Sequence, residues 1–486
     1  YGGINGNTFA ITRTETSNLT TVYAGKGNDT IYVGSKANAS SNVGGNANLI
    51  NGKLIINGQG GVDRLIVDDT NDVDVTGLTM DRETIAAVTY GRLVGLASAN
   101  ILYDTLEFVE INLGDAGNIV QVKSSQAGSI TTLNTGAGVD DVTVGSTLDD
   151  STSNVKDLAG RLVVDGEGAA DTLRINDSGY ALNTFDGVLS ATTLTGLGTA
   201  GIDYKNIEIL NVDLGSAEDA FTIVSTNVTT VTNVRSQDGD DTITVGAPGH
   251  TLREIAGQLY LTAGNGTGDK VVFDDRDETN AHTWTLDTAT LSGSGIGLPI
   301  NFNTFEYVDL TLGQGQDTLY IKNTIVIPDE FDPLVTHEPH VTINTFAGSD
   351  FVNIETLQAT TYIQGGDDAD TFRVNYNEAG IQTFNDGVDY LTLQGDAGND
   401  TYLIGLSGSG ESDITVNGGD ADELKVYGTN NPDVFLFRPN AIVAIETDGN
   451  YQPKLNGGTE RVNYGLGGNA LGGGVVVYGR DGDDKF

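Results

Sequence analysis

The sequence contains no cysteine, only 8 prolines, one methionine and one tryptophan in 486 residues. Without cysteine it has neither a disulfide framework nor a thiolate metal site. Uninterrupted apolar runs long enough to cross a bilayer are also missing, as is a signal peptide, so we expect no membrane span. Helical periodicity is scarce too, and its best candidate is residues 81–88.

Basic residues are sparse, with 24 Lys and Arg against 67 Asp and Glu and a net charge of −43. Such a surface repels nucleic acid and anionic lipid, so we expect neither as a partner. The chain also repels itself, and bound divalent cations are the simplest compensation. It is 38% hydrophobic, too apolar for a disordered acidic tail, and its 66 glycines are too many for a compact helical protein.

A glycine- and aspartate-rich corner followed by a short β-branched strand recurs along the chain. It reads QDGDDTITVG at residues 237–246, KGNDTIYVG at 26–34 and GAGVDDVTVG at 136–145. Glycine permits a tight bend, and the alternating Thr, Ile and Val residues suit a strand with one buried face. The pattern predicts a coil of short strands joined by such corners.

The spacing of the corners predicts a solenoid. Steps of about 22, 30 and 48 residues recur, so a module of roughly one hundred residues is repeated. A 22-residue step leaves space for two or three short strands, and a step of 48 is two coils of which the middle one lost its motif. The aligned corner residues are Asp29, Asp63, Asn118, Asp140, Asp171, Asp219, Asp241, Asp269, Asp317, Asp350, Asp370, Asp400 and Asp422.

Changes in this rhythm predict the domain organisation. Residues 1–324 form a solenoid of about three modules, 325–345 an irregular proline-containing insertion, 346–428 a continued solenoid, and 429–486 a less regular, truncated continuation. The chain starts with Tyr1 and stops within a corner, so we expect a piece of a longer protein.

Three corners resemble the calcium-binding nonapeptide GGxGxDxUx of RTX proteins: GGDDADTFR at 365–373, GDAGNDTYL at 395–403 and GRDGDDKF at 479–486. The chain as a whole resembles the RTX-like repeat regions of very large bacterial cell-surface proteins. The resemblance covers most of residues 20–425. It implies an all-β fold, a right-handed parallel β-helix or β-solenoid with Gly-Asp corners, and Ca²⁺ held by aspartates and turn carbonyls between coils.

Two sets of aspartates are the candidate calcium ligands. The resemblance matches Asp29, Asp140, Asp241, Asp317, Asp370, Asp400 and Asp484 to the ligand position. The acid-rich corners add residues that would repel one another without a cation: Asp238, Asp240, Asp367, Asp396, Asp420, Asp422 and Asp481. The alternative at every corner is an Asx-turn, in which the carboxylate accepts backbone N–H groups and shapes the bend without a metal.

The sequence contains no nucleophile elbow, phosphate loop, dinucleotide fingerprint or HExxH motif, so we do not expect an enzyme. We expect a structural or adhesive rod or filament segment, extracellular or on the cell surface and stabilised by calcium. It would associate with neighbouring copies of itself or with surface polysaccharide. The alternatives are a carbohydrate-active β-helix enzyme of the polysaccharide lyase or epimerase type, and a plain calcium-binding spacer.

Overall fold

The computed structural model describes residues 1–486 except 149–151, 182–185, 327–339, 385–386, 389, 409, 411, 420, 449, 455–457 and 466–470. The described residues form 40 strands and one short 3-10 helix, η1 (Leu252–Glu254). The chain divides into two compact units. Unit 1 is Tyr1–Asp241 with Gly257–Gly266, and unit 2 is Thr242–Ala256 with Thr267–Phe486. In each unit the strands fall into two mostly parallel sheets, which confirms the prediction of an all-β solenoid.

The two sheets of unit 1 are called 1a and 1b. Sheet 1a contains β1 (Thr8–Ile11), β3 (Thr30–Val33), β5 (Arg64–Asp68), β9 (Phe108–Asn112), β11 (Ile130–Asn134), β13 (Arg161–Asp165), β15 (Gly187–Leu189), β16 (Thr193–Thr195), β17 (Ile202–Lys205) and β19 (Ala220–Ile223). Sheet 1b contains β2 (Thr20–Lys26), β4 (Leu54–Gly60), β6 (Gly77–Ile85), β7 (Val88–Val94), β8 (Ile101–Asp104), β10 (Ile119–Val122), β12 (Asp141–Val144), β14 (Thr172–Asn176), β18 (Ile209–Asp213), β20 (Val231–Arg235) and β22 (Leu259–Thr262).

The two sheets of unit 2 are called 2a and 2b. Sheet 2a contains β21 (Thr242–Gly246), β23 (Lys270–Asp274), β27 (Tyr307–Thr311), β29 (Val341–Asn344), β31 (Thr361–Gln364), β33 (Leu391–Gln394), β35 (Ser412–Asn417), β37 (Phe435–Arg438), β38 (Ala441–Ile445) and β39 (Thr459–Tyr464). Sheet 2b contains β24 (Thr283–Asp287), β25 (Thr290–Gly293), β26 (Ile300–Asn303), β28 (Thr318–Ile321), β30 (Phe351–Ile354), β32 (Thr371–Val374), β34 (Thr401–Gly405), β36 (Glu423–Tyr427) and β40 (Gly474–Tyr478).

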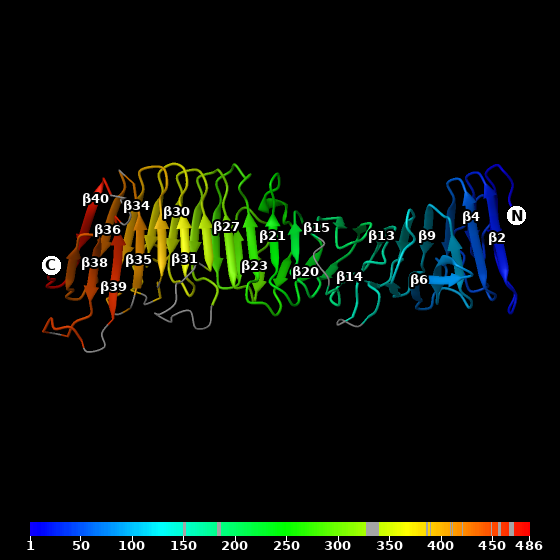
Figure 1. Cartoon of the computed structure of the whole chain (residues 1–486), viewed down its shortest axis with the longest axis horizontal. Helices are drawn as coiled ribbons and strands as arrows, with labels where there is room; N and C mark the ends of the chain where they lie inside the picture. The colour runs from blue at the N-terminus through cyan, green and yellow to red at the C-terminus, as the bar shows by residue number, and fades with distance from the viewer. Residues whose placement is uncertain are drawn as a thin grey trace. The chain divides into compact units, whose positions relative to one another are not determined.

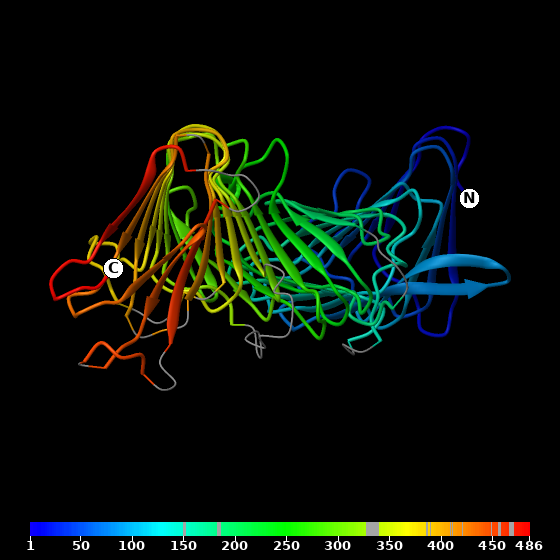
Figure 2. The same cartoon turned by 60° about the vertical axis from the view of Figure 1, so that its left-hand side comes forward.

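Successive strands of the chain alternate between the two sheets, so one coil contributes one strand to each. In Figure 1 the strands of unit 2 from β23 to β36 lie side by side in this way, and Figure 2 shows them in two layers. Equivalent residues stack in register: Val120 pairs with Val142 in sheet 1b, and Ile111 with Leu133 in sheet 1a. These side chains are 0–1% exposed. The alternation of apolar and polar residues along each strand therefore produces a continuous core between the sheets.

In four coils of the described part of the chain, a three-stranded antiparallel meander replaces one strand. The meanders are β6–β8 and β15–β17 in unit 1, and β24–β26 and β37–β39 in unit 2. Within each unit the two meanders lie in opposite sheets. They lengthen the coils concerned, and the first three account for the steps of about 48 residues in the sequence. Such a step is one coil lengthened by a meander plus the half coil to the next corner, so the expectation of two coils is wrong.

The helical candidate at residues 81–88 is wrong, because this segment is the end of the β6–β7 hairpin. Figure 2 shows this hairpin, in light blue, extending beyond its neighbours. Met80 pairs with Leu93 across the two strands and both are buried, so cross-strand packing overrides a weak helical pattern. Ala86 and Ala87 form the two-residue turn with φ of 49° and 71°.

Most of the predicted insertion at 325–345 lies outside the described residues, since 327–339 are not described. The solenoid resumes within the predicted range, because β29 pairs with β27 and β31. The predicted domain boundaries otherwise stay predictions. Trp284, the single tryptophan, is fully buried in β24.

Candidate functional site

The corner aspartates of unit 2 form a ladder along the solenoid. Asp317, Asp350, Asp370, Asp400 and Asp422 each directly precede a strand of sheet 2b, and each is 1–3% exposed. The Oδ1 atom of each accepts the backbone N–H of the equivalent residue on the preceding coil. The bonds run from His282 to Asp317 (2.6 Å), Asp317 to Asp350 (2.6 Å), Asp350 to Asp370 (2.8 Å), Asp370 to Asp400 (2.8 Å) and Asp400 to Asp422 (2.9 Å).

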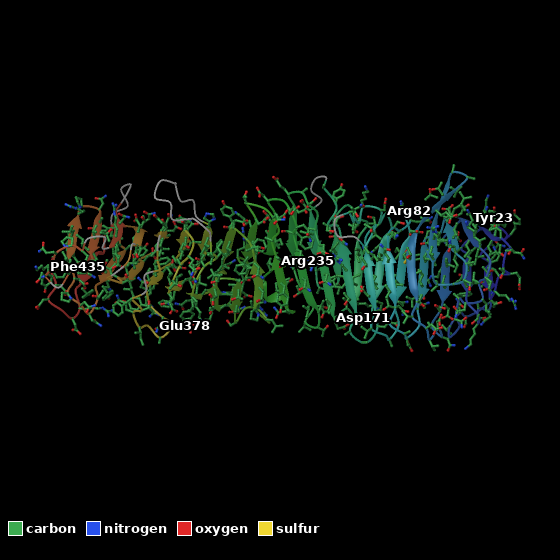
Figure 3. All side chains as sticks on the ribbon, turned by 90° about the horizontal axis from the view of Figure 1, so that it is seen from below. Tyr23, Arg82, Asp171, Arg235, Glu378 and Phe435 are labelled. Atoms are coloured by element: carbon green, nitrogen blue, oxygen red, sulfur yellow. The ribbon has the colours of Figure 1, made fainter. Side chains whose placement is uncertain are left out.

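Unit 1 contains equivalent ladders. The N–H groups of Asn7, Asp29, Asn118, Asp140 and Asp219 donate to Asp29 (2.6 Å), Asp63 (2.8 Å), Asp140 (2.6 Å), Asp171 (2.8 Å) and Asp241 (2.7 Å) respectively. Figure 3 marks Asp171 among the side chains. Each bond closes the gap between two corners that are 22 to 34 residues apart in the chain.

Three ladders end on a glutamate, a residue type that the Gly-Asp corner pattern does not include. The Oε2 atoms of Glu107, Glu208 and Glu306 accept the N–H of Asp63 (2.7 Å), Asp171 (2.8 Å) and Asp269 (3.0 Å). The sequence pattern predicts that these coils lack the Gly-Asp corner. In the structure, the longer side chain of a glutamate accepts the N–H of the preceding corner in place of an aspartate. The signal was present in the sequence, because each glutamate, like each corner aspartate, directly precedes a strand.

Glycine recurs in the corners because the buried carboxylate fills the space of a side chain. Gly365 and Gly395 lie five residues before Asp370 and Asp400. A Cβ atom added to these glycines would lie 2.3 and 1.9 Å from Oδ2 of the respective aspartate. The spacing Gly-x₄-Asp therefore reflects close packing of the carboxylate on the corner backbone.

The second carboxylate oxygen, Oδ2, lacks a hydrogen-bond donor at many corners. It is buried without a partner in Asp29, Asp63, Asp140, Asp171, Asp350, Asp370 and Asp400. Asn118 shows how an amide meets this environment: its Oδ1 accepts the N–H of Thr76, and its Nδ2 donates to the carbonyls of Gly114 (2.9 Å) and Thr135 (2.8 Å). At that corner Nδ2 of Asn118 takes the place of an aspartate Oδ2 and faces two carbonyl oxygens. An ionised Oδ2 in the same place would need a bound proton or a neighbouring cation.

Burial raises the pKa of these aspartates. The pKa rises to about 8 for Asp350, about 7 for Asp370 and about 6 for Asp171 and Asp400. Desolvation is the largest cause, the backbone hydrogen bond opposes it, and repulsion from the neighbouring corner adds to it. A carboxylate stack of this kind favours bound protons or cations.

The structure separates the predicted calcium ligands into two groups. Asp29, Asp140, Asp241, Asp317, Asp370, Asp400 and Asp422 are buried in ladders, whereas Asp238, Asp240, Asp367, Asp396 and Asp481 are exposed. Asp484 is half-buried and accepts the N–H of Asp433 (3.0 Å), and Asp420 lies outside the described residues. Among the described residues, no three His, Asp or Glu side chains come together as a group that could hold a metal. A corner therefore offers an ion one buried carboxylate oxygen, and its other ligands would have to be backbone carbonyls or water.

A second set of buried aspartates was not recognised in the sequence. Asp69, Asp177 and Asp275 each follow a strand by one residue, in three successive modules. Their Oδ1 atoms accept the N–H of Ala47 (2.8 Å), Val155 (2.9 Å) and Leu252 (2.7 Å), and burial raises each pKa to about 7. These carboxylates tie a long corner loop to the next coil.

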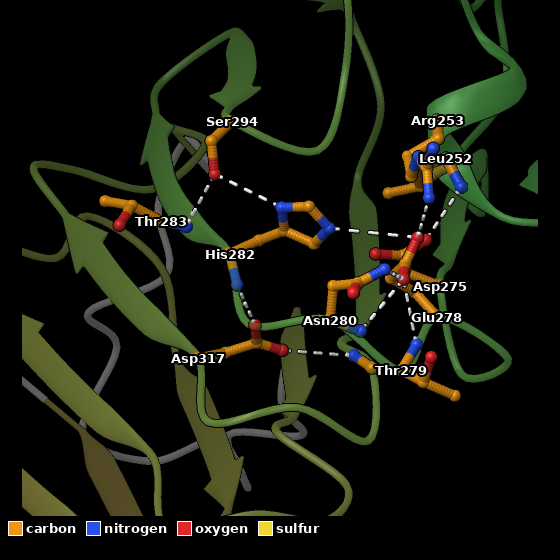
Figure 4. A network of polar contacts seen from close by, with 11 residues as sticks. Leu252, Arg253, Asp275, Glu278, Thr279, Asn280, His282, Thr283, Ser294 and Asp317 are labelled. Carbon is orange, nitrogen blue, oxygen red and sulfur yellow. Dashed lines mark hydrogen bonds and ion pairs between the residues drawn. The ribbon is translucent and has the colours of Figure 1, made fainter.

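Around Asp275 the module carries additional ionisable groups (Figure 4). Glu278 accepts the N–H groups of Thr279 and Asn280 (both 2.9 Å) and lies 3.4 Å from Arg253. Burial raises the pKa of Glu278, but these hydrogen bonds outweigh it and leave the pKa below its usual value. His282 lies with Nδ1 3.2 Å from Ser294 Oγ and Nε2 3.8 Å from Glu278. The carboxylate of Glu278 thus holds the backbone of its own loop in place through the N–H groups of Thr279 and Asn280.

Parallel strands stacked coil on coil in two sheets, with buried carboxylates joining the corners, place this protein in the class of β-solenoids. No known protein family matches the chain, and no curated protein matches it. In the part of the chain that the structure describes, no helix is long and apolar enough to cross a bilayer.

Proposed function

We propose that this chain is a structural or adhesive segment of a secreted or cell-surface protein, in which stacked coils form a stiff solenoid that packs with neighbouring copies. The observation that carries the proposal is the use of the corner carboxylates. They recur in both units, and each holds the N–H of the preceding coil instead of contributing to one reactive centre. An intramolecular hydrogen bond contributes about 0.5–1.5 kcal/mol net, so a ladder of them stabilises the stacking of coils.

Calcium at the corners is the second part of the proposal. The unpartnered Oδ2 atoms of Asp370 and Asp400 support it, because an adjacent cation would remove the cost of burying their charge. Burial is the largest cause of the raised pKa of both aspartates, and repulsion from the neighbouring corner and from the exposed Asp396 adds to it, so this pair of corners concentrates negative charge. We therefore include in this proposal that the corners are calcium sites of the RTX-like kind.

Negative-stain electron microscopy of the purified chain tests the structural role. We expect elongated particles of uniform width, and lateral or end-to-end assemblies at high protein concentration. Compact particles without assemblies, together with depolymerisation of pectin or alginate by the same sample, would instead favour the carbohydrate-active enzyme.

A further inference from the structure

Most arginines of this acidic chain are neutralised by a carboxylate. The pairs are Arg13–Glu15, Arg82–Asp157, Arg92–Asp81, Arg161–Asp203, Arg174–Asp213, Arg235–Asp213, Arg253–Glu278 and Arg276–Asp274. With 67 acidic and 24 basic residues, such pairing is expected. An arginine without a carboxylate partner is therefore the exception that needs a reason.

Arg438 and Arg461 are two such exceptions, and both belong to the β37–β39 meander. Within the described residues, neither guanidinium has a carboxylate oxygen within 4.0 Å. The strand β35 presents Asp413 in register with Arg461, but Oδ1 of Asp413 accepts the amide N–H of Asn463 (2.5 Å). Both arginine side chains are exposed.

The register of the meander places both arginines on one face. Arg438 pairs with Ala441, and Val443 pairs with Arg461. Directly paired residues project to the same side, as do residues two apart on one strand. The opposite face carries Ile442 and Val462, which are fully buried in the core. Arg438 and Arg461 therefore stand on the outer face, with the small side chains of Ala441 and Val443 between them.

These residues line a hollow of about 550 Å³, which we call the arginine hollow. Its lining is Arg438, Pro439, Asn440, Ala441, Val443, Thr459 and Arg461. Among the described residues, the lining contains two positive charges and no carboxylate, on a chain whose net charge is −43, and the nearby Asp413 of β35 is bonded to Asn463. Pro439, Ala441 and Val443 supply apolar surface, and Asn440 and Thr459 supply hydrogen-bonding groups.

The first meander, β6–β8, provides an internal comparison. Its Arg92 pairs in register with Asp81, and the two form a two-point ion pair with Nε–Oδ1 of 2.7 Å and Nη2–Oδ2 of 2.6 Å. Glu83 adds a second contact at 3.1 Å. The same structural element thus neutralises its arginine in one module and leaves two arginines without a carboxylate in another.

We propose that the arginine hollow binds an acidic polysaccharide through the carboxylate of a uronate residue. Guanidinium groups bind carboxylates with two parallel hydrogen bonds, and the apolar floor can contact the faces of sugar rings while Asn440 and Thr459 bond hydroxyl groups. Two arginines do not neutralise enough phosphates for nucleic acid, which the remaining acidic surface repels. At physiological salt the Debye length is about 8 Å, so the distant acidic surface acts weakly on a ligand in the hollow.

This inference deepens the adhesive side of the proposed function, on which it rests, and the two are tested separately. Particle shape in the electron microscope does not depend on Arg438 or Arg461. If the particles are elongated and no acidic sugar binds, only the inference fails.

Isothermal titration calorimetry of the whole chain with trigalacturonate, in 150 mM salt with EGTA, tests the inference. We expect binding of trigalacturonate and at least about tenfold weaker binding of the neutral galactose trimer, which is a difference of about 1.4 kcal/mol. The double variant Arg438→Gln/Arg461→Gln should lose at least tenfold in affinity, whereas the exposed Arg13→Gln should keep it. Circular dichroism of each variant confirms that it is folded.

Equal binding of the neutral trimer, unchanged binding by the folded double variant, or no binding of trigalacturonate at millimolar concentration would overturn the inference. A fourth outcome would also overturn it. If sedimentation shows self-association that the double variant abolishes, the hollow holds an acidic corner of a second copy. The single variants Arg438→Lys and Arg461→Lys keep the charge but remove the two-point geometry, so we expect partial losses from each.

Discussion

At the scale of single residues, the corner aspartates combine a satisfied and an unsatisfied oxygen. In Asp350 and Asp370, Oδ1 accepts the N–H of the preceding coil and Oδ2 is buried without a donor. The same side chain that joins two coils therefore carries an electrostatic cost when it is ionised. This cost makes the stability of the solenoid sensitive to protons and to cations.

We expect the free energy of unfolding, measured in EGTA, to fall as pH rises from about 4 to about 8. The pKa of Asp350 rises to about 8 and that of Asp370 to about 7, against about 3.8 in the unfolded chain. A raised folded-state pKa contributes stability that is fully present below the unfolded pKa and is lost as pH rises through the folded pKa. Urea denaturation at pH 5, 7 and 9 measures the slope, and a maximum at pH 9 would contradict it.

Asn118 predicts the effect of amides at other corners. Asp400→Asn keeps an oxygen acceptor for the N–H of Asp370 and removes the charge, so we expect it to stabilise the chain at pH 8 in EGTA by about 1 kcal/mol. Asp400→Ala removes the acceptor and should destabilise by about 1–3 kcal/mol. Urea denaturation compares both with the exposed control Asp240→Asn. Equal destabilisation by Asn and Ala would show that the charge itself is required.

At the scale of elements, the β6–β7 hairpin contains a turn whose residues do not match its geometry. Ala86 and Ala87 both have positive φ, which suits Asn-Gly far better than Ala-Ala. The double variant Ala86→Asn/Ala87→Gly should raise the free energy of unfolding by about 1–2 kcal/mol, because each left-handed alanine costs about 1–2 kcal/mol and the greater chain entropy of glycine offsets about 0.5–1 kcal/mol of the gain. Thermal melting measures the change.

Ala127→Gly is the matched control for this turn. Ala127 is exposed and is not among the residues with positive φ, so the substitution should stabilise nothing. If both variants were more thermally stable, the effect of the added glycine would not come from relief of backbone strain in the β6–β7 turn.

The same hairpin shows where sequence reasoning reached its limit. Residues 81–88 carry a weak helical pattern, yet Met80 and Leu93 are brought together by pairing across the turn. The corners were predictable because glycine, aspartate and a β-branched strand lie together in the sequence. Glu107 has the same place before a strand as the corner aspartates, but its bond to Asp63, 44 positions away, could be identified only in the folded chain.

At the scale of the whole molecule, we expect calcium to raise the melting temperature. A ligand that binds only the folded state adds about 2.7 kcal/mol per site to the free energy of unfolding when its free concentration is 100 times its dissociation constant. Binding at several corners would add these contributions together. Differential scanning calorimetry in 1 mM calcium and in EGTA measures the effect. An unchanged melting temperature would contradict the calcium part of the proposal.

The variants separate calcium from general screening of charge. Asp370→Asn/Asp400→Asn should reduce the calcium effect, because both buried oxygens that favour a cation are replaced by amide nitrogens. Asp238→Asn/Asp240→Asn removes two exposed charges and should leave most of it. A similar loss in both variants would assign the effect to the net charge of −43 rather than to the corners.

The sequence by itself determined the repeat, the corners and the all-β class, because glycine, aspartate and alternating apolar residues act over a few neighbouring positions. Only the tertiary structure decided what each carboxylate does. The partner of Asp370 is a backbone N–H on another coil, and the environment of its second oxygen is formed by stacking. Arg438 and Arg461 likewise became a site only through strand pairing, since register, not sequence distance, places two side chains on one face.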